Sequence, residues 1–167
     1  MTVYKFFDTD STGQKEYDIA GSHYRILLKT CFAYCNTFSV MINYTVRACV
    51  SVFDGIEEYR LPITKNITRA YRHYGDFSEN KHKNGAYEIR HYKLCPETQK
   101  ILIDITDSIF KWIYGWGYSN PEDPAFYRAD GSVFFCSTIH EGECTLLVNE
   151  GENIADIVSC GPWIKIT

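Results

Sequence analysis

Two cysteines and a histidine recur at intervals of four residues, at Cys136, His140 and Cys144, and Glu141 follows the histidine. Zinc in proteins binds about four thiolate or imidazole ligands arranged in a tetrahedron. The remaining ligands could come from distant residues of the same kinds: Cys31, Cys35 or His91. The chain lacks the paired C-x2-C knuckles of structural zinc sites. The simpler expectation is therefore two core thiols that flank a turn histidine, with a zinc site as the alternative.

The same residues could serve a small hydrolase, with Cys136 as the nucleophile, His140 as the general base and Glu141 as the carboxylate that orients it. A zinc protease motif would need a second histidine at position 144, where the chain has a cysteine. Adjacent residues of a strand also point to opposite faces, which would separate His140 from Glu141. The chain has neither a glycine-rich phosphate loop nor a G-x-S-x-G elbow. We therefore expect no cofactor, and we favour a protein without catalytic activity over an enzyme.

A three-stranded antiparallel meander is predicted to carry these residues. Three segments are rich in the β-branched and aromatic residues typical of strands: 125–128, 133–139 and 143–148. Asp130-Gly131 suits the positive φ angles of a tight turn between the first two segments. Pro121 and Pro124 should lie in a loop before the meander, because proline donates no hydrogen bond inside a central strand.

The two faces of the middle segment, 133–139, are both apolar. A period of two predicts one face with the side chains of Val133, Phe135, Ser137 and Ile139. The other face would hold Phe134, Cys136 and Thr138. Because neither face is clearly polar, we expect this strand to be central in its sheet and covered on both sides.

The rest of the chain predicts further strands and helices around the meander. The strand candidates are 3–7, 15–19, 37–44, 47–53 and 86–94. The helix candidates are 23–36, with Ser22 as its N-cap, then 96–112 and 152–159. Trp163 should dock the C-terminal segment. These elements predict one α+β domain over 1–167, with a mostly antiparallel sheet and two or three helices packed mainly on one face.

Composition indicates an ordinary globular chain. Its 167 residues are 45% hydrophobic and 23% charged, include 13 Tyr and 10 Phe, and carry a net charge of −4. Seven cysteines without a signal peptide predict a cytoplasmic protein with reduced thiols. No apolar run is long enough to span a membrane, so we expect no membrane partner.

Charge is distributed unevenly along the chain. Segment 65–93 holds seven basic and three acidic residues, whereas 94–167 holds four basic and eleven acidic ones. Basic and aromatic residues interleave at 68–74, a pattern that can stack bases and neutralise phosphate. We expect no nucleic-acid partner, because this short stretch belongs to an acidic protein. The acidic half could instead bind a basic protein.

One succession of motifs resembles a known class of proteins. Residues 120–128 read N-P-E-D-P-A-F-Y-R and are followed by Asp130-Gly131, an aromatic pair at 134–135 and S-T-I-H-E at 137–141. This succession resembles small bacterial immunity-like proteins of polymorphic toxin systems. The segment 31–39, C-F-A-Y-C-N-T-F-S, is similar to their helix-to-strand junction. The resemblance implies a cytoplasmic, non-catalytic protein that binds a toxin and blocks its active site.

We therefore expect a protein-binding module, with a toxin or a nuclease as its partner. An inhibitor needs a rigid scaffold and a patch that combines charged with aromatic side chains. The predicted binding residues are Trp116, Tyr118, Glu122, Asp123, Tyr127, Arg128, Asp130, His140 and Glu141. A nuclease inhibitor acting through the acidic C-terminal half is one alternative, and the cysteine- or zinc-dependent hydrolase described above is the other.

Overall fold

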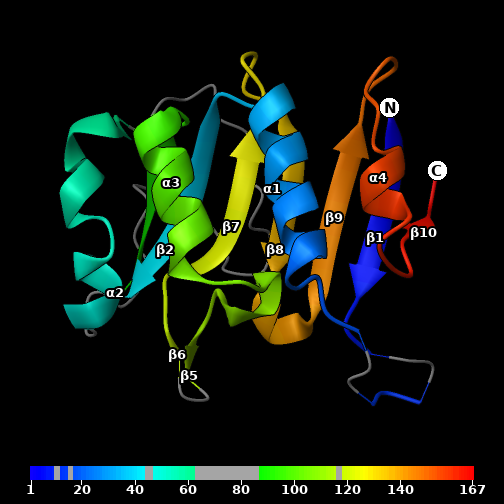
Figure 1. Cartoon of the computed structure of the whole chain (residues 1–167), viewed down its shortest axis with the longest axis horizontal. Helices are drawn as coiled ribbons and strands as arrows, with labels where there is room; N and C mark the ends of the chain where they lie inside the picture. The colour runs from blue at the N-terminus through cyan, green and yellow to red at the C-terminus, as the bar shows by residue number, and fades with distance from the viewer. Residues whose placement is uncertain (10–11, 15–16, 44–46, 63–86, 116–117) are drawn as a thin grey trace.

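The computed structural model describes residues 1–167 except for 10–11, 15–16, 44–46, 63–86 and 116–117. Eight strands form one antiparallel sheet in the order β10-β1-β9-β8-β7-β2-β4-β3 (Figure 1). They are β1 (Thr2–Phe7), β2 (Thr37–Asn43), β3 (Arg60–Leu61), β4 (Tyr87–Lys93), β7 (Glu122–Tyr127), β8 (Val133–Thr138), β9 (Glu143–Val148) and β10 (Ile164–Lys165). The expected meander, β7–β8–β9, lies inside this sheet. A separate hairpin pairs β5 (Tyr114–Gly115) with β6 (Tyr118–Ser119).

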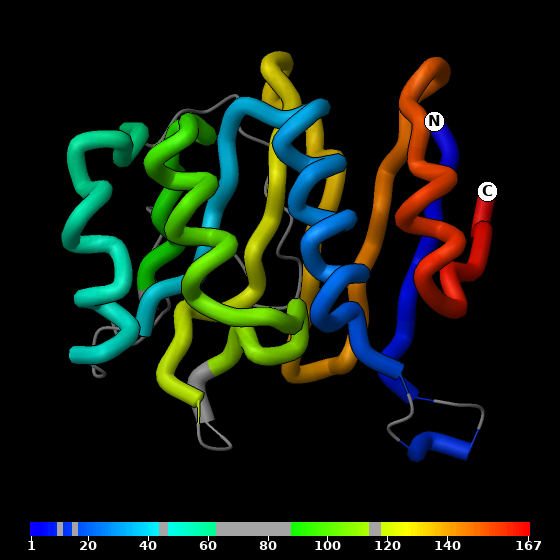
Figure 2. Tube along the Cα trace, viewed as in Figure 1, coloured from blue at the N-terminus to red at the C-terminus, as the bar shows by residue number. Residues whose placement is uncertain are grey.

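The helices lie on one face of the sheet, where α1, α3 and α4 pass in front of it (Figures 1 and 2). The α-helices are α1 (Ser22–Tyr34), α2 (Arg47–Ser51), α3 (Pro96–Ile105) and α4 (Ala155–Val158), and the 3₁₀ turns are η1 (Asp54–Tyr59), η3 (Ile109–Lys111) and η4 (Ile139–Glu141). The expected α+β fold is confirmed. No helix in the described part of the chain is both long and apolar enough to cross a membrane.

The main core lies between α1, α3 and the sheet. Helix α1 buries a stripe of side chains spaced three and four residues apart, which is the spacing of one helical face: Tyr24, Leu27, Leu28 and Cys31. The Tyr24 hydroxyl donates a hydrogen bond to the carbonyl of Leu102 in α3 and accepts one from Trp112 Nε1, both at 2.9 Å. This buried pair of bonds joins α1 to α3 and to the segment that leads into the β5–β6 hairpin.

Strand β7 contains Pro124 even though it lies between β8 and β2, so the expectation of a loop through Pro124 is wrong. The β2–β7 register shifts after Ser39↔Ala125, and Asp123 and Pro124 together occupy the place of one residue. Such a β-bulge interrupts the ladder, and for this reason it tolerates a residue without an N–H. Asp123 has a positive φ of 51°, which is uncommon for a residue other than glycine.

A second irregularity corrects the predicted faces of β8. Phe126 pairs with Phe135 and Tyr127 pairs with Val133, so Phe134 is an extra residue. Both phenylalanines of β8 join the core beneath the helices, while Val133 belongs to a smaller cluster on the opposite face. The predicted grouping of Val133 with Phe135 is therefore wrong, because a period of two does not anticipate a bulge.

The helical prediction for 96–112 was too long. Helix α3 ends at Ile105, and the extended Thr106 follows. The buried Ser108 hydroxyl donates to the Asp18 carboxylate at 2.8 Å and accepts a hydrogen bond from Phe110 N at 3.1 Å. Ser108 is thus the N-cap of the separate turn η3, and its bond to Asp18 links this turn to a distant part of the chain.

Of the other segment predictions, several are wrong and one is confirmed. Segment 47–53 begins with α2 rather than a strand, and 17–19, the described part of 15–19, forms no strand. Gly21, not Ser22, occupies the N-cap position of α1, and α4 is shorter than 152–159. The docking of Trp163 is confirmed by its ring contact with Phe6, at 5.3 Å between centroids. Segment 68–74 lies outside the described residues.

Candidate functional site

The predicted zinc ligands do not come together. Cys136 pairs with Thr145 across the β8–β9 ladder, whereas Cys144 pairs with Ser137. Directly paired residues share a face and successive residues alternate, so the two thiols point to opposite faces of the sheet. Cys144 lies in the core beneath the helices, and Cys136 packs against the smaller cluster on the other face. Among the described residues, no group of three or more His, Cys, Asp and Glu could hold a metal ion.

The thiols also lack the environment of a nucleophile. Burial raises the pKa of Cys136 to about 12, and the nearby Glu143 carboxylate adds to that rise. Burial likewise raises the pKa of Cys35 to about 12 and that of Cys49 to about 11, and it holds the pKa values of Cys31 and Cys144 well above the ordinary value. Because the thiolate is the reactive species, these cysteines behave as small apolar residues near neutral pH.

His140 and Glu141 occupy a turn rather than a strand, which corrects the expectation that they point to opposite faces. Both lie in η4, between β8 and β9, with side chains that are 39% and 40% exposed. The histidine Nε2 is 3.8 Å from the Glu141 Oε1. The two side chains therefore form one exposed polar pair at the end of the sheet.

This turn is held from both sides. Asp123, which is fully buried in the β7 bulge, accepts a hydrogen bond from Ile139 N through its carboxylate at 2.7 Å. Gly142 N donates to the Ile139 carbonyl at 3.0 Å, and Asp8 N donates to the Gly142 carbonyl at 2.8 Å. These bonds tie η4 to β7 and to the end of β1, so the polar pair stands on a fixed backbone.

Gly142 is required where the turn closes. Its φ is +68°, in the left-handed region that favours glycine. A Cβ at this position would lie 2.0 Å from Oδ1 of the buried Asp8. The carboxylate of Asp8 therefore packs against the turn in space that only glycine leaves open.

Four of the predicted binding residues are buried and cannot form a surface: Glu122, Asp123, Tyr127 and Arg128. Tyr127 lies on the helix-free face, where its hydroxyl is 3.0 Å from Ser39 Oγ and its ring is 5.6 Å from that of His91. Neither neighbour, Ser39 or His91, was among the predicted binding residues. Trp116 lies outside the described residues.

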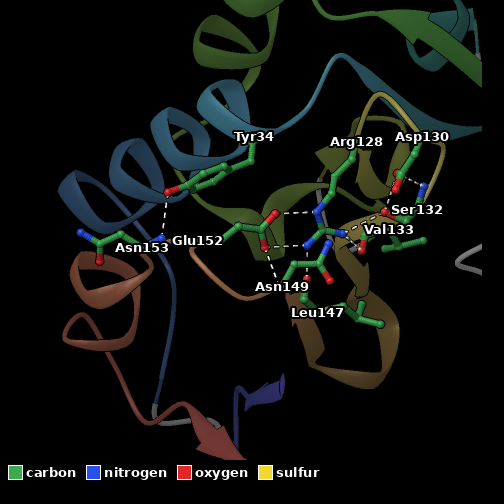
Figure 3. Close-up of polar contacts among 9 residues, drawn as sticks. All are labelled: Tyr34, Arg128, Asp130, Ser132, Val133, Leu147, Asn149, Glu152 and Asn153. Carbon is green, nitrogen blue, oxygen red and sulfur yellow. Dashed lines mark hydrogen bonds and ion pairs between the residues drawn. The ribbon is translucent and has the colours of Figure 1, made fainter. Parts of the chain in front are cut away.

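Arg128 clamps the β7–β8 hairpin to the turn after β9 (Figure 3). Its Nε and Nη2 donate to the two carboxylate oxygens of Glu152 at 2.6 and 2.7 Å. Nη1 donates to the Val133 carbonyl at 2.6 Å and to Ser132 Oγ at 3.2 Å, and Nη2 also donates to the Leu147 carbonyl. The guanidinium is thus saturated by internal acceptors.

The exposed members of the predicted set divide between the two ends of the sheet. Asp130, at the β7–β8 turn, lies at one end, and its carboxylate accepts hydrogen bonds from Ser132 N and Oγ. The β5–β6 hairpin and the β8–β9 turn are both at the other end (Figure 1). The side chain of Asn120 anchors the hairpin by donating to the Lys111 carbonyl at 2.8 Å.

The end of the sheet with η4 is therefore the candidate site. It presents His140 and Glu141 on the fixed turn, together with Tyr118, which is 38% exposed on β6. We call this set the η4 surface. Comparisons of the chain with protein-family models, with curated proteins and with solved structures found no match. The resemblance to immunity-like proteins stays a prediction from the motif at 120–141.

Proposed function

We propose that this protein is a non-catalytic protein-binding module, an immunity-type inhibitor whose partner is a toxin or a nuclease. The observation that carries the proposal is the exposed His140–Glu141 pair on a turn with a fixed backbone. A recognition element that is rigid before binding loses little conformational entropy when the partner docks. Both residues also belong to the motif on which the resemblance rests.

The composition of the η4 surface supports a protein partner. Tyrosine offers a large contact area with a hydroxyl at its edge, and it is enriched at protein interfaces. Charged side chains at the rim of an interface set the association rate and the choice of partner. Tyr118 and the His140–Glu141 pair together supply both kinds of group at one end of the sheet.

Binding is favoured over the hydrolase alternative by the state of the thiol. A hydrolase built on Cys136 would need its thiolate, and burial holds the pKa of that thiol at about 12. Cys136 also points to the helix-free face, and the paired β8–β9 ladder fixes it there.

The test is capture of the partner by tagged protein, followed by an activity assay of the captured protein. The test variant is His140→Ala/Glu141→Ala, and the matched control is Lys100→Ala/Asp104→Ala, which removes another exposed ion pair from α3. We expect wild type and control to capture a stoichiometric partner and inhibit its activity. The test variant should bind about 30-fold more weakly, the loss of about 2 kcal/mol that defines a hot spot.

Equal binding by both variants would refute the role of the η4 surface. An uninhibited partner, or none at all, would refute the inhibitor function. For the nuclease alternative, affinity should fall steeply as salt rises, because an acidic surface that binds a basic enzyme is screened by ions. Stoichiometric zinc in the purified protein would instead favour the hydrolase.

A further inference from the structure

The helix-free face of the sheet changes character between β7 and β8. Away from the strand ends, its side chains on β2, β4 and β7 are buried: Ser39, Met41, Ile89, His91, Ala125 and Tyr127. Beyond β7, the burial of β9 alternates strictly, with Cys144, Leu146 and Val148 buried beneath the helices. The residues between them face the other way and are only partly buried. One half of this face is therefore open.

The open half-face consists of side chains from β8, β9, β1 and β10. The ladders place them on one surface, because Cys136 pairs with Thr145, Thr145 with Lys5, and Lys5 with Ile164. Six of its residues are apolar: Val3, Phe7, Cys136, Leu147, Ile164 and Ile166. Cys136 and Leu147 border the buried half and pack against its small cluster. Its other members are Thr138, Thr145, Lys5 and Glu143.

This composition is unlike that of a sheet face that meets water. An antiparallel sheet with one solvated face normally alternates apolar residues inward with polar residues outward. Here Ile164 and Ile166 are 51% and 53% exposed at the sheet edge, and Phe7 and Leu147 are partly buried further in. Covering such a surface would remove apolar area from water, which is favourable.

The charges on the open half-face indicate what covers it. They are one cation and one anion, Lys5 and Glu143, which form an ion pair on adjacent strands. The patch is therefore neutral, although the chain carries a net charge of −4. A twofold axis that passes between these two side chains would place each copy's lysine opposite the other copy's glutamate. A surface that complements itself in this way suits a twofold-symmetric interface.

We propose that two copies of this chain form a homodimer by packing their open half-faces against each other, sheet on sheet. Stacked sheets lie about 10 Å apart, a distance that side chains from both faces fill. Four strands at about 4.8 Å spacing and about 3.4 Å per residue give a footprint of roughly 20 Å by 20 Å. The two footprints together cover about 800 Å², below the roughly 1,200–2,000 Å² of stable interfaces, so the dimer should be weak and concentration-dependent.

The first test is sedimentation velocity over a concentration series from about 1 μM to 1 mM, the range of weak dimers. The test variant is Ile164→Lys/Ile166→Lys, and the control is Ile103→Lys, which changes an isoleucine that is 46% exposed on α3. We expect wild type and control to shift from monomer to dimer with rising concentration, while the test variant stays monomeric. Circular dichroism checks that all three are folded.

A second test uses the charges. Lys5→Glu and Glu143→Lys should each remove the homodimer, because each brings like charges together across the twofold axis. Mixing the two variants should restore a dimer that contains one copy of each. A wild type that stays monomeric throughout, or a test variant that dimerises like wild type, would overturn the proposal. If wild type is monomeric and captures a different protein that the Ile164→Lys/Ile166→Lys variant does not capture, the open half-face binds that protein instead.

Discussion

The Arg128–Glu152 ion pair should be a major determinant of stability. The two side chains are only 10% and 11% exposed, and Arg128 bridges the β7–β8 hairpin and the turn after β9. Arg128→Met would leave a buried carboxylate without its cation and would take a donor from each of two backbone carbonyls. Removing one partner of a buried ion pair costs about 3–5 kcal/mol. For a chain of this length, that loss corresponds to a fall in Tm of about 6–20 °C.

The pH dependence of this loss follows from the pKa of Glu152. Burial alone would raise that pKa, but the hydrogen bonds from Arg128 and from Asn149 N outweigh burial and lower it. A carboxyl group whose pKa is lower in the folded state stabilises the fold above its unfolded pKa, about 4.3. That stability is lost as the pH falls through the folded pKa. The difference between wild type and Arg128→Met should therefore be largest at neutral pH and smaller in acid.

The assay is urea unfolding followed by tryptophan fluorescence and circular dichroism, at pH 7 and at pH values below 4. A double-mutant cycle with Glu152→Leu isolates the pair, since the double variant leaves no unpaired buried charge. We expect Arg128→Met/Glu152→Leu to be more stable than the sum of the single changes implies. A cost below about 1 kcal/mol for Arg128→Met, which is typical of a surface pair, would refute the reasoning. So would a coupling energy of zero.

Three further predictions concern the turn, the core and the thiol. Gly142→Ala should lower stability by at least about 1 kcal/mol more than Gly151→Ala, since both glycines have positive φ but only Gly142 faces Asp8; equal losses in urea unfolding would contradict this. Tyr24→Phe should cost about 1–3 kcal/mol, because Trp112 Nε1 and the Leu102 carbonyl lose their buried partner; an unchanged unfolding midpoint would show that these bonds contribute little. Alkylation of Cys136 by iodoacetamide, followed by peptide mass spectrometry, should be slower than that of glutathione at pH 7 and should rise as the pH approaches 12; rapid reaction at pH 7 would mean an activated thiol.

Local patterns in the sequence were sufficient for the meander and for α1. Strands form within segments 133–139 and 143–148, as their β-branched and aromatic residues predict. A turn forms at Asp130-Gly131, where only Gly131 has the predicted positive φ, 81°. The apolar spacing in 23–36 correctly predicted a helix. These features are determined by residues that are close together in the chain, so the sequence alone is sufficient to predict them.

Long-range contacts explain the failures. Pro124 enters a central strand because a bulge against β2 accommodates it, and α3 ends early where Ser108 bonds to Asp18. Segment 47–53 becomes helical where Cys49, in α2, donates hydrogen bonds to the carbonyls of Ser119 and Asn120. In each case the partner is distant in the sequence, and intrinsic propensity is too weak to oppose tertiary contacts.

The candidate site shows the same division. The sequence by itself determined which polar and titratable residues lie between 116 and 144. It also determined that a hairpin turn lies among them. Only the tertiary structure decided that Arg128 is an internal clamp, that Cys136 and Cys144 point to opposite faces, and that His140 and Glu141 stand together on an exposed turn. The physical reason is that burial and strand register depend on which segments pack together, and a residue's type and spacing do not specify its partners across the sheet.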